Sequence, residues 1–305
     1  MLRVSTTSAR SSTTSGLKRA KGLRLPHDIR ARLAAIGGSN DGDIDLGLAA
    51  LVLAAIDRPG VSHGRYLRHL EQLAEDVRAY VGGAGGDAPP ALDLRIEALV
   101  QVIARRFGYG GTEETFDDLD AANLMRVIDG RTGLPVALGI LFIQTARALG
   151  WPISGLDFPG RFLVRLEVGN ERRVIDPFAG GRIIETQDMR DMFKAVAGNH
   201  VELEPKHYRA MGNRDILLRL QNNIKARLLR ASRFDDVIEV LEAMVLFAPD
   251  HAELWHELGM LNARLDHVVA AIEALEQHLR LSPGMGADVR YNTSRLLQEL
   301  RQRLN

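Results

Sequence analysis

A repeat of 34 residues near the C-terminus limits the folds open to this chain more than any other feature of the sequence. The segments FAPDHAELWHELG (247–259) and RLSPGMGADVR (280–290) place Pro249 and Pro283 34 residues apart. From Asn213 onwards the hydrophobic pattern is helical, so each unit predicts a pair of helices. Such pairs bury their apolar faces by stacking on one another, which predicts an all-α domain at 213–305.

Residues at fixed places in these units resemble the tetratricopeptide repeat. The second unit has the expected residue types at Trp255, Leu258, Gly259, Ala271, Leu275 and Pro283. The first unit matches at Ile224, Leu228, Leu241 and Pro249, but Lys225 and Val237 occupy its small-residue positions. We therefore expect repeats over 218–251 and 252–285 and a capping helix over 288–304. A plain array of helical hairpins is the alternative.

Charge is balanced over the whole chain but unevenly placed along it. There are 39 basic and 39 acidic residues, and residues 1–27 hold six of the basic ones and no acid. Residues 28–305 therefore carry a net charge of −6, which argues against nucleic acid as a partner. The longest uncharged stretch near residue 140, Thr132 to Ala146, has 15 residues and is too short to cross a bilayer. We expect a cytoplasmic protein that binds neither nucleic acid nor membrane.

The first 40 residues differ in composition from the rest. They are rich in Ser, Thr, Gly and Arg and poor in apolar residues, which predicts a disordered tail over 1–40. An Arg- and Ser-rich start without acids also resembles an organellar transit peptide, so import into an organelle is an alternative. A start placed too far upstream would give the same pattern.

Four helices are expected between this tail and residue 130. The third lies beyond GGAGGDAPP (82–90), the segment richest in helix-breaking residues. A longer apolar helix then runs from Gly133 to about Leu149. The four helices are expected over 43–60, 62–81, 92–107 and 118–129.

After residue 150 the hydrophobic period changes from helical to alternating. ISGLDF (153–158), RFLVRLEV (161–168) and RRVID (172–176) are typical of strands, and a short strand near 182–184 is expected to follow. Gly169 suits a hairpin turn because it adopts positive φ without strain. One buried helix against a small antiparallel sheet makes 41–205 a predicted α+β domain.

Three segments of this domain resemble the bacterial SirB-type transglutaminase-like family. They are ANLMRVIDGRTGLPVALGILFIQTARALGWP (122–152), FPGRFLVRLEV (158–168) and RRVIDPF (172–178). The resemblance covers roughly 43–285, and members often carry C-terminal tetratricopeptide repeats. It implies a papain-like core in which a Cys opens the buried helix, a His opens a strand, and an Asp ends the next strand before a Pro.

The implied Cys-His-Asp triad is incomplete in this chain. The Cys position falls at or next to Pro135, and the His position is Arg161. Only Asp176 of VIDPF remains. The chain has no cysteine, so a thiol nucleophile is excluded, and an Arg cannot act as a base near neutral pH because its pKa exceeds about 12.

The sequence predicts a structural role for the retained Asp176. An Asp before Pro at a strand end accepts hydrogen bonds from nearby backbone N–H groups. We further expect Arg161 and Asp176 to form an ion pair within the former active site. A relocated hydrolase site is the alternative, with Thr132 near the helix start and His200 or His207 folding back towards it.

Other polar motifs give little sign of a ligand. NDGDID (40–45) alternates acids as a calcium loop does, but Leu46 stands where that loop needs Gly and Val52 where it needs a carboxylate. These acids are expected to favour the positive end of the following helix. GYGGTEE (108–114) lacks the Lys and the preceding strand of a phosphate loop, so it is predicted to be an ordinary loop. We expect no metal and no cofactor.

The repeats are the expected binding surface. In tetratricopeptide arrays the first helix of each repeat lines a concave groove, and its three arginines here give a positive bias that suits acidic or carboxylate-bearing protein segments. The groove positions are Arg219, Asn222, Leu229 and Arg230 in the first unit and Glu253, His256, Met260 and Arg264 in the second. The sequence thus predicts a non-catalytic scaffold that binds an unidentified protein, with the relocated hydrolase as the alternative.

Overall fold

The computed structural model describes residues 25–84, 89–284 and 286–303. Its sheet has four antiparallel strands in the order β1-β2-β3-β4. The predicted strands are confirmed, each ending within two residues of its expected bounds. Gly169 has φ +57° in the turn between the second and third strands. The strands are β1 (Ile153–Leu156), β2 (Leu163–Val168), β3 (Glu171–Asp176) and β4 (Arg182–Ile184).

The predicted apolar helix is α6 (Pro135–Ala148), which packs against β1 and β2. It is buried along almost its whole length, as its uncharged sequence requires. A Cβ on Gly139 would lie 2.3 Å from a ring carbon of Phe162, so helix and sheet approach closely only because this residue has no side chain. The α+β class expected for this region is therefore observed.

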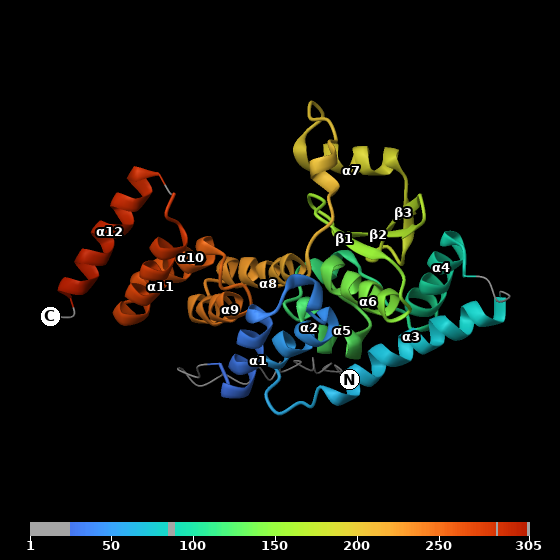
Figure 1. Ribbon diagram of the computed structural model, residues 1–305, viewed down its shortest axis with the longest axis horizontal. Coiled ribbons are helices and arrows are strands. Elements are labelled where there is room, and N and C mark those ends of the chain that lie inside the picture. Colours follow the sequence, from blue (N-terminus) through green and yellow to red (C-terminus); the bar gives the residue numbers. More distant parts are fainter. Residues whose placement is uncertain (1–24, 85–88, 285, 304–305) are drawn as a thin grey trace, which may run out of the picture.

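Four further helices pack against α6, and one of them, α4, also contacts β2 and β3 (Figure 1). The four predicted segments are helical, although α5 is shorter than expected because the Asn123 side chain caps it by accepting from the Arg126 N–H at 3.2 Å. Beyond α4 the chain continues as a π-helical segment, Val100–Arg106. These helices are α2 (Leu46–Ala55), α3 (Gly64–Ala84), α4 (Leu92–Leu99) and α5 (Leu124–Gly130); α7 (Thr186–Ala197) follows the sheet.

The expectation of a disordered tail up to residue 40 is wrong for residues 27–38. They form α1 (His27–Gly38), which packs against α2 and α9 (Phe234–Phe247). Ile29 and Leu33 lie four residues apart, so both point into the core and are at most 4% exposed. Two buried side chains are enough to hold a helix whose average composition is polar. Residues 1–24, including the possible transit peptide, lie outside the described residues.

The C-terminal part consists of two helix pairs and a last single helix, as predicted. A Cβ on Gly259 would lie 2.6 Å from Leu275, which explains the small residue at this crossing. In the first pair Lys225 holds the equivalent place and forms an ion pair with Glu257 of the next repeat. The helices are α8 (Asn213–Arg230) with α9, α10 (Ala252–Arg264) with α11 (Val268–Leu281), and α12 (Ala287–Gln302).

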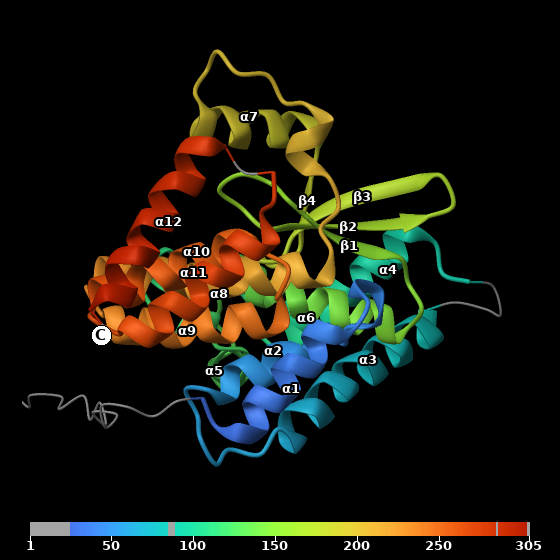
Figure 2. The same ribbon diagram turned by 60° about the vertical axis from the view of Figure 1, so that its left-hand side comes forward.

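The α8 helix joins the two parts, and one hydrophobic core runs across the junction. Ile216, Leu217 and Leu220 of α8 are buried in the same cluster as α2 and α6. Figure 1 shows α8 lying between the sheet side and the other repeat helices. Figure 2 shows α7 and α12 rising on the same side of the row that α8 and α10 form.

The acidic segment 41–45 acts as a cap. Asp45 accepts from the Leu48 N–H at 2.9 Å and caps α2, which confirms the expected role for this residue. Asp41 caps a distant helix instead, because its carboxylate accepts from the N–H groups of Asn213 and Arg214, at 2.8 and 2.7 Å, at the start of α8. Among the described residues, no three His, Asp or Glu side chains lie together in a way that could hold a metal ion.

Candidate functional site

The three positions assigned to the triad by resemblance lie at the ends of α6, β2 and β3. Pro135 is the first residue of α6, Arg161 lies just before β2, and Asp176 is the last residue of β3. Proline suits the first turn of a helix because its missing N–H would be unpaired there. These are the places in the fold at which the resemblance expects the Cys, His and Asp, and the assignment of a triad to them stays a prediction.

Arg161 and Asp176 form the predicted ion pair. The guanidinium donates from Nε at 2.8 Å and lies 2.7 Å away through Nη2, both to Oδ2 of Asp176. Its central carbon also lies 4.5 Å from the centre of the Phe178 ring. The Asp176 side chain is only 4% exposed, so this is a buried carboxylate with a dedicated cationic partner.

The second oxygen of Asp176 caps the turn that follows β3. Oδ1 accepts from the backbone N–H groups of Phe178 at 2.9 Å and Ala179 at 3.3 Å, as expected for an Asp before Pro. Each carboxylate oxygen thus has its own donors, one set from Arg161 and one from the backbone.

A glycine-rich loop runs between the start of α6 and this turn. Gly111 donates its N–H to the Phe178 carbonyl at 3.2 Å, and Gly133 donates to the Gly110 carbonyl at 3.3 Å. A Cβ on Gly111 would lie 2.0 Å from the Phe178 ring, so only glycine fits there. The predicted loop therefore links the segment before α6 to the turn after β3, a role that its sequence did not reveal.

The proposed substitutes for the triad lie in other environments. The Thr132 hydroxyl donates to the Gly130 carbonyl at 3.4 Å, and no hydrogen bond joins it to a histidine among the described residues. His207 accepts from the Glu204 N–H at 3.0 Å and stacks on Phe193 with ring centres 4.4 Å apart. His200 is exposed beyond α7. These contacts offer no support for a relocated nucleophile and base.

Arg219 was expected to face a bound peptide, and its guanidinium is hydrogen-bonded to the core domain. Its Nη2 donates to the carbonyls of Phe158 at 2.8 Å and Arg161 at 2.9 Å, and its Nη1 donates to Asp157 at 3.3 Å. Burial lowers the pKa of this arginine, which the nearby Asp157 partly offsets. The residue also lines an open groove along α8, so peptide contact at this position stays a prediction.

Arg227, one of the residues that sequence analysis missed, makes the second such link from α8. Its guanidinium donates to the Phe116 carbonyl from Nε at 3.0 Å and from Nη2 at 2.7 Å. The Phe116 ring in turn lies 4.9 Å from the Phe178 ring beneath Arg161. The first repeat helix therefore contacts two separate segments of the core, one at Phe116 and one at residues 157–161.

An open groove of about 830 Å³ lies between α8 and the segment leading into it. Asn222, a predicted peptide contact, lines this groove together with Asn223 and Arg209. The segment around Ala210 pairs with the outer edge of β1, since Asp157 donates to the Arg209 carbonyl and Met211 donates to the Gly155 carbonyl. The groove therefore has a rigid wall on each side.

The remaining predicted contacts lie further along α8 and α10. Leu229 and Met260 are 44% and 45% exposed, which is high for large apolar side chains in a packed array. Arg264 lies over the ring of Phe234 at 4.8 Å. His256 is half-buried against His278, and burial lowers its pKa. Arg230 and Glu253 are exposed, and for this whole set peptide binding stays a prediction.

Two family models match this chain and together span most of it. Residues 64–222 match the model described as the transglutaminase-like superfamily, and residues 224–305 match a tetratricopeptide repeat model. The chain belongs to the transglutaminase-like superfamily. The first match ends inside α8, in agreement with the packing of that helix onto the transglutaminase-like core.

Relatives of similar architecture occur in several bacteria. A UPF0162 protein of Xylella fastidiosa is 27% identical over 251 residues, covering 80% of this chain and 86% of its own length. A UPF0162 protein of Pseudomonas aeruginosa is 28% identical, covering 78% of this chain and 88% of its own. A crystal structure of menin aligns over 84% of this chain and 69% of its own with 11% identity, but its TM-score of 0.37 is too low to support an argument.

Among the helices that the structure describes, none is long and apolar enough to cross a membrane. The expected cytoplasmic location stays a prediction.

Proposed function

We propose that this protein is a non-catalytic, SirB-type interaction scaffold. Its transglutaminase-like core has lost the chemistry of its triad, and its repeats bind a partner protein. The observation that carries the first half is the Arg161–Asp176 pair, 2.7 Å apart and partly buried. The carboxylate that would orient a catalytic His holds a permanent cation instead, and that cation cannot accept a proton near neutral pH.

The second half rests on the exposed face of the repeats. Leu229 and Met260 offer apolar contact, while Arg230 and Arg264 offer planar, bidentate donors for carboxylates. Among the described residues, neither of these two arginines has a carboxylate in salt-bridge contact. We therefore propose that the partner presents an acidic or carboxylate-bearing segment, whose chain follows α8 towards the groove beside Asn222. Arg219 lines that groove too, but its guanidinium is hydrogen-bonded to the core.

Charge reversal tests this function. In Arg230→Glu/Arg264→Glu we expect loss of the partners that the wild-type protein captures from its own cell extract, with the circular dichroism spectrum unchanged. The matched control is Arg78→Glu/Arg280→Glu, which makes the same charge change at exposed sites on α3 and α11. An unchanged partner set in the folded Arg230/Arg264 variant, or equal loss in the control, would exclude this surface.

A further inference from the structure

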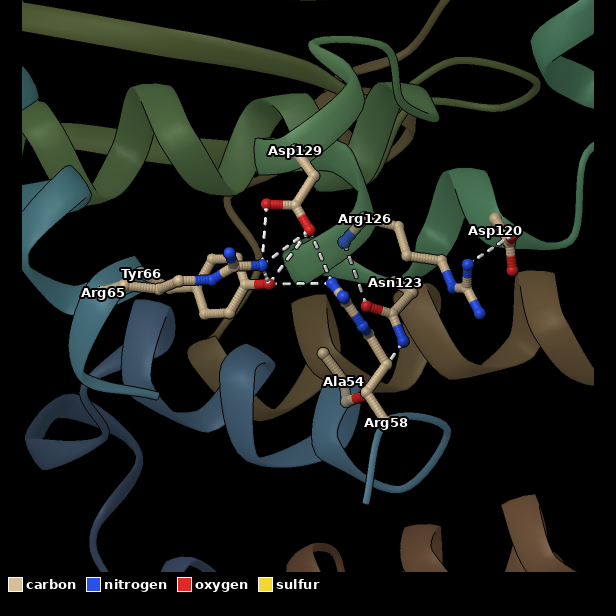
Figure 3. A network of polar contacts seen from close by, with 8 residues as sticks. All are labelled: Ala54, Arg58, Arg65, Tyr66, Asp120, Asn123, Arg126 and Asp129. Carbon is tan, nitrogen blue, oxygen red and sulfur yellow. Dashed lines mark hydrogen bonds and ion pairs between the residues drawn. The ribbon is translucent and has the colours of Figure 1, made fainter. Parts of the chain in front are cut away.

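A second cluster of charged residues lies where α3 meets the ends of α2 and α5. Arg58 follows α2, Arg65 lies in the first turn of α3, and both reach Asp129 in the last turn of α5 (Figure 3). Nη1 of Arg58 is 2.6 Å and Nη2 of Arg65 is 3.0 Å from Oδ2 of Asp129. The buried hydroxyl of Tyr66 donates to the same oxygen at 3.0 Å.

A third arginine lies two residues beyond Asp129. Arg131 has φ +60°, a left-handed conformation that is strained for a residue with a side chain. Its Nη1 donates to Nε2 of His69 at 2.8 Å and to the hydroxyl of Tyr109, which is 1% exposed. Its guanidinium lies over the rings of Tyr109 and Phe107 at 4.8 and 5.5 Å. None of these partners is acidic.

The arginine cluster, defined as Arg58, Arg65 and Arg131, therefore carries an excess of positive charge. Arg58 and Arg65 share the carboxylate of Asp129, and Arg131 contacts no carboxylate among the described residues. His69 adds no further positive charge. Burial and Arg131 lower its pKa to about 4, so it is neutral at pH 7. Two positive charges remain in a partly desolvated place, where charge without a counterion is unfavourable.

The donors of this cluster are also incompletely used. Each of its arginines makes its hydrogen bonds within the described residues through a single terminal nitrogen. The side chains of Arg58 and Arg65 are 22% and 54% exposed, so solvent reaches the rest of their forks. Planar forks with free donors on a shared site suit the oxygens of a tetrahedral oxyanion.

We propose that the arginine cluster binds a phosphate-type dianion, either inorganic phosphate or a phosphomonoester. The dianion matches the two surplus charges and accepts from the free guanidinium donors. Asp129 sets the arginines in place and also competes with the ligand, since its own carboxylate occupies part of their donor capacity. This site is separate from the surface proposed for partner binding and does not depend on it.

Thermal unfolding and titration calorimetry at pH 7.5 test the proposal with two probes, inorganic phosphate and phenyl phosphate. Sodium chloride and sodium acetate at equal ionic strength are the reference salts. We expect a saturable rise in Tm with at least one probe and not with the reference salts. Tighter binding of phenyl phosphate would identify an ester as the ligand, and tighter binding of inorganic phosphate would identify the free ion.

Three substitutions make the test specific. Arg131→Gly removes the guanidinium and favours the left-handed turn, and Arg65→Gln changes an exposed side chain. We expect both variants to keep the fold and to lose the rise in Tm with phosphate. Arg68→Gln, on the same helix but outside the cluster, keeps it. Asp129→Asn removes the competing charge and is expected to bind phosphate about tenfold more tightly. Absence of a saturable response in the wild type, or an unchanged response in Arg131→Gly and Arg65→Gln, would overturn the proposal.

Discussion

The two ends of α8 use the same residue type in opposite ways. In the first part of the helix, Arg219 makes three hydrogen bonds to the 157–161 loop of the core. At its last turn, Arg230 is exposed and has no carboxylate in salt-bridge contact among the described residues. One arginine therefore fastens two parts of the molecule together, while the other is available to an external ligand.

This difference shows how the fold has reassigned its charged groups. Arg161 is paired with Asp176, and Arg219 and Arg227 of α8 donate to backbone carbonyls of the core. Exposed apolar and basic side chains lie further along α8 and on α10. Under the function proposed above, the first set of arginines serves stability and the second set serves recognition.

The largest effect is expected at the Arg161–Asp176 pair. Asp176→Ala strands a partly buried cation and removes two backbone caps, so we expect a loss of about 3–5 kcal/mol in the free energy of unfolding. Urea unfolding of Asp176→Ala, Arg161→Ala and the double variant measures the coupling. Strictly additive losses would mean that the two residues do not interact.

The second largest effect is expected in the pH dependence of stability, through His69 of the core domain. His69 has a pKa of about 4 in the folded state and 6.5 when unfolded, so the unfolded chain binds more protons between these values. The free energy of unfolding that this residue contributes is fully present above pH 6.5 and is lost as the pH falls from 6.5 to about 4. The loss is at most about 3 kcal/mol, and solvent screening of the partly exposed ring reduces it. Urea unfolding across this range should show a shallower decline in His69→Gln. An identical decline would contradict the assignment.

The comparison along α8 is tested by one matched pair. Arg219→Ala removes hydrogen bonds between a charged group and the core and should cost about 1.5–3 kcal/mol. Arg230→Ala should change stability by less than about 0.5 kcal/mol, as for other surface positions. Both are measured by urea unfolding. Equal losses would remove the distinction between the two ends of the helix.

The smallest effect concerns the cap that Asp41 provides to α8. Asp41→Ala leaves two N–H groups at the helix start without an acceptor and should cost about 1–2 kcal/mol. Asp43→Ala, which alters an exposed acid two residues away that accepts from Asn40, is the control and should be nearly neutral. A neutral Asp41→Ala would show that water replaces this cap fully.

Local patterns in the sequence were enough to predict the strands, the buried α6, the helix pairs and the place of Asp176. Each depends on hydrophobic period or on turn residues within a few positions of one another. The Arg161–Asp176 pair was predicted from the family resemblance, which places the two positions opposite each other, and not from a local pattern. The α1 helix was missed because two buried side chains, Ile29 and Leu33, stand in a polar context.

The remaining errors arose from contacts between distant segments. Arg219 lies on the face expected to line a groove, and nothing nearby in the sequence shows that the 157–161 loop covers it. Asp41 caps a helix 172 residues away. The His69–Arg131 contact spans 62 residues and likewise has no local signature. Polar side chains with long-range partners carry no periodic pattern, so only the folded structure reveals their roles.

The central claim is that the transglutaminase-like core performs no amide chemistry, and turnover measures this directly. The purified full chain and Asp176→Ala are incubated with a panel of glutamine and peptide amides, and ammonia and cleaved peptide are quantified against buffer. The account predicts no release above buffer from either protein. Release by the wild-type chain that Asp176→Ala abolishes would contradict it.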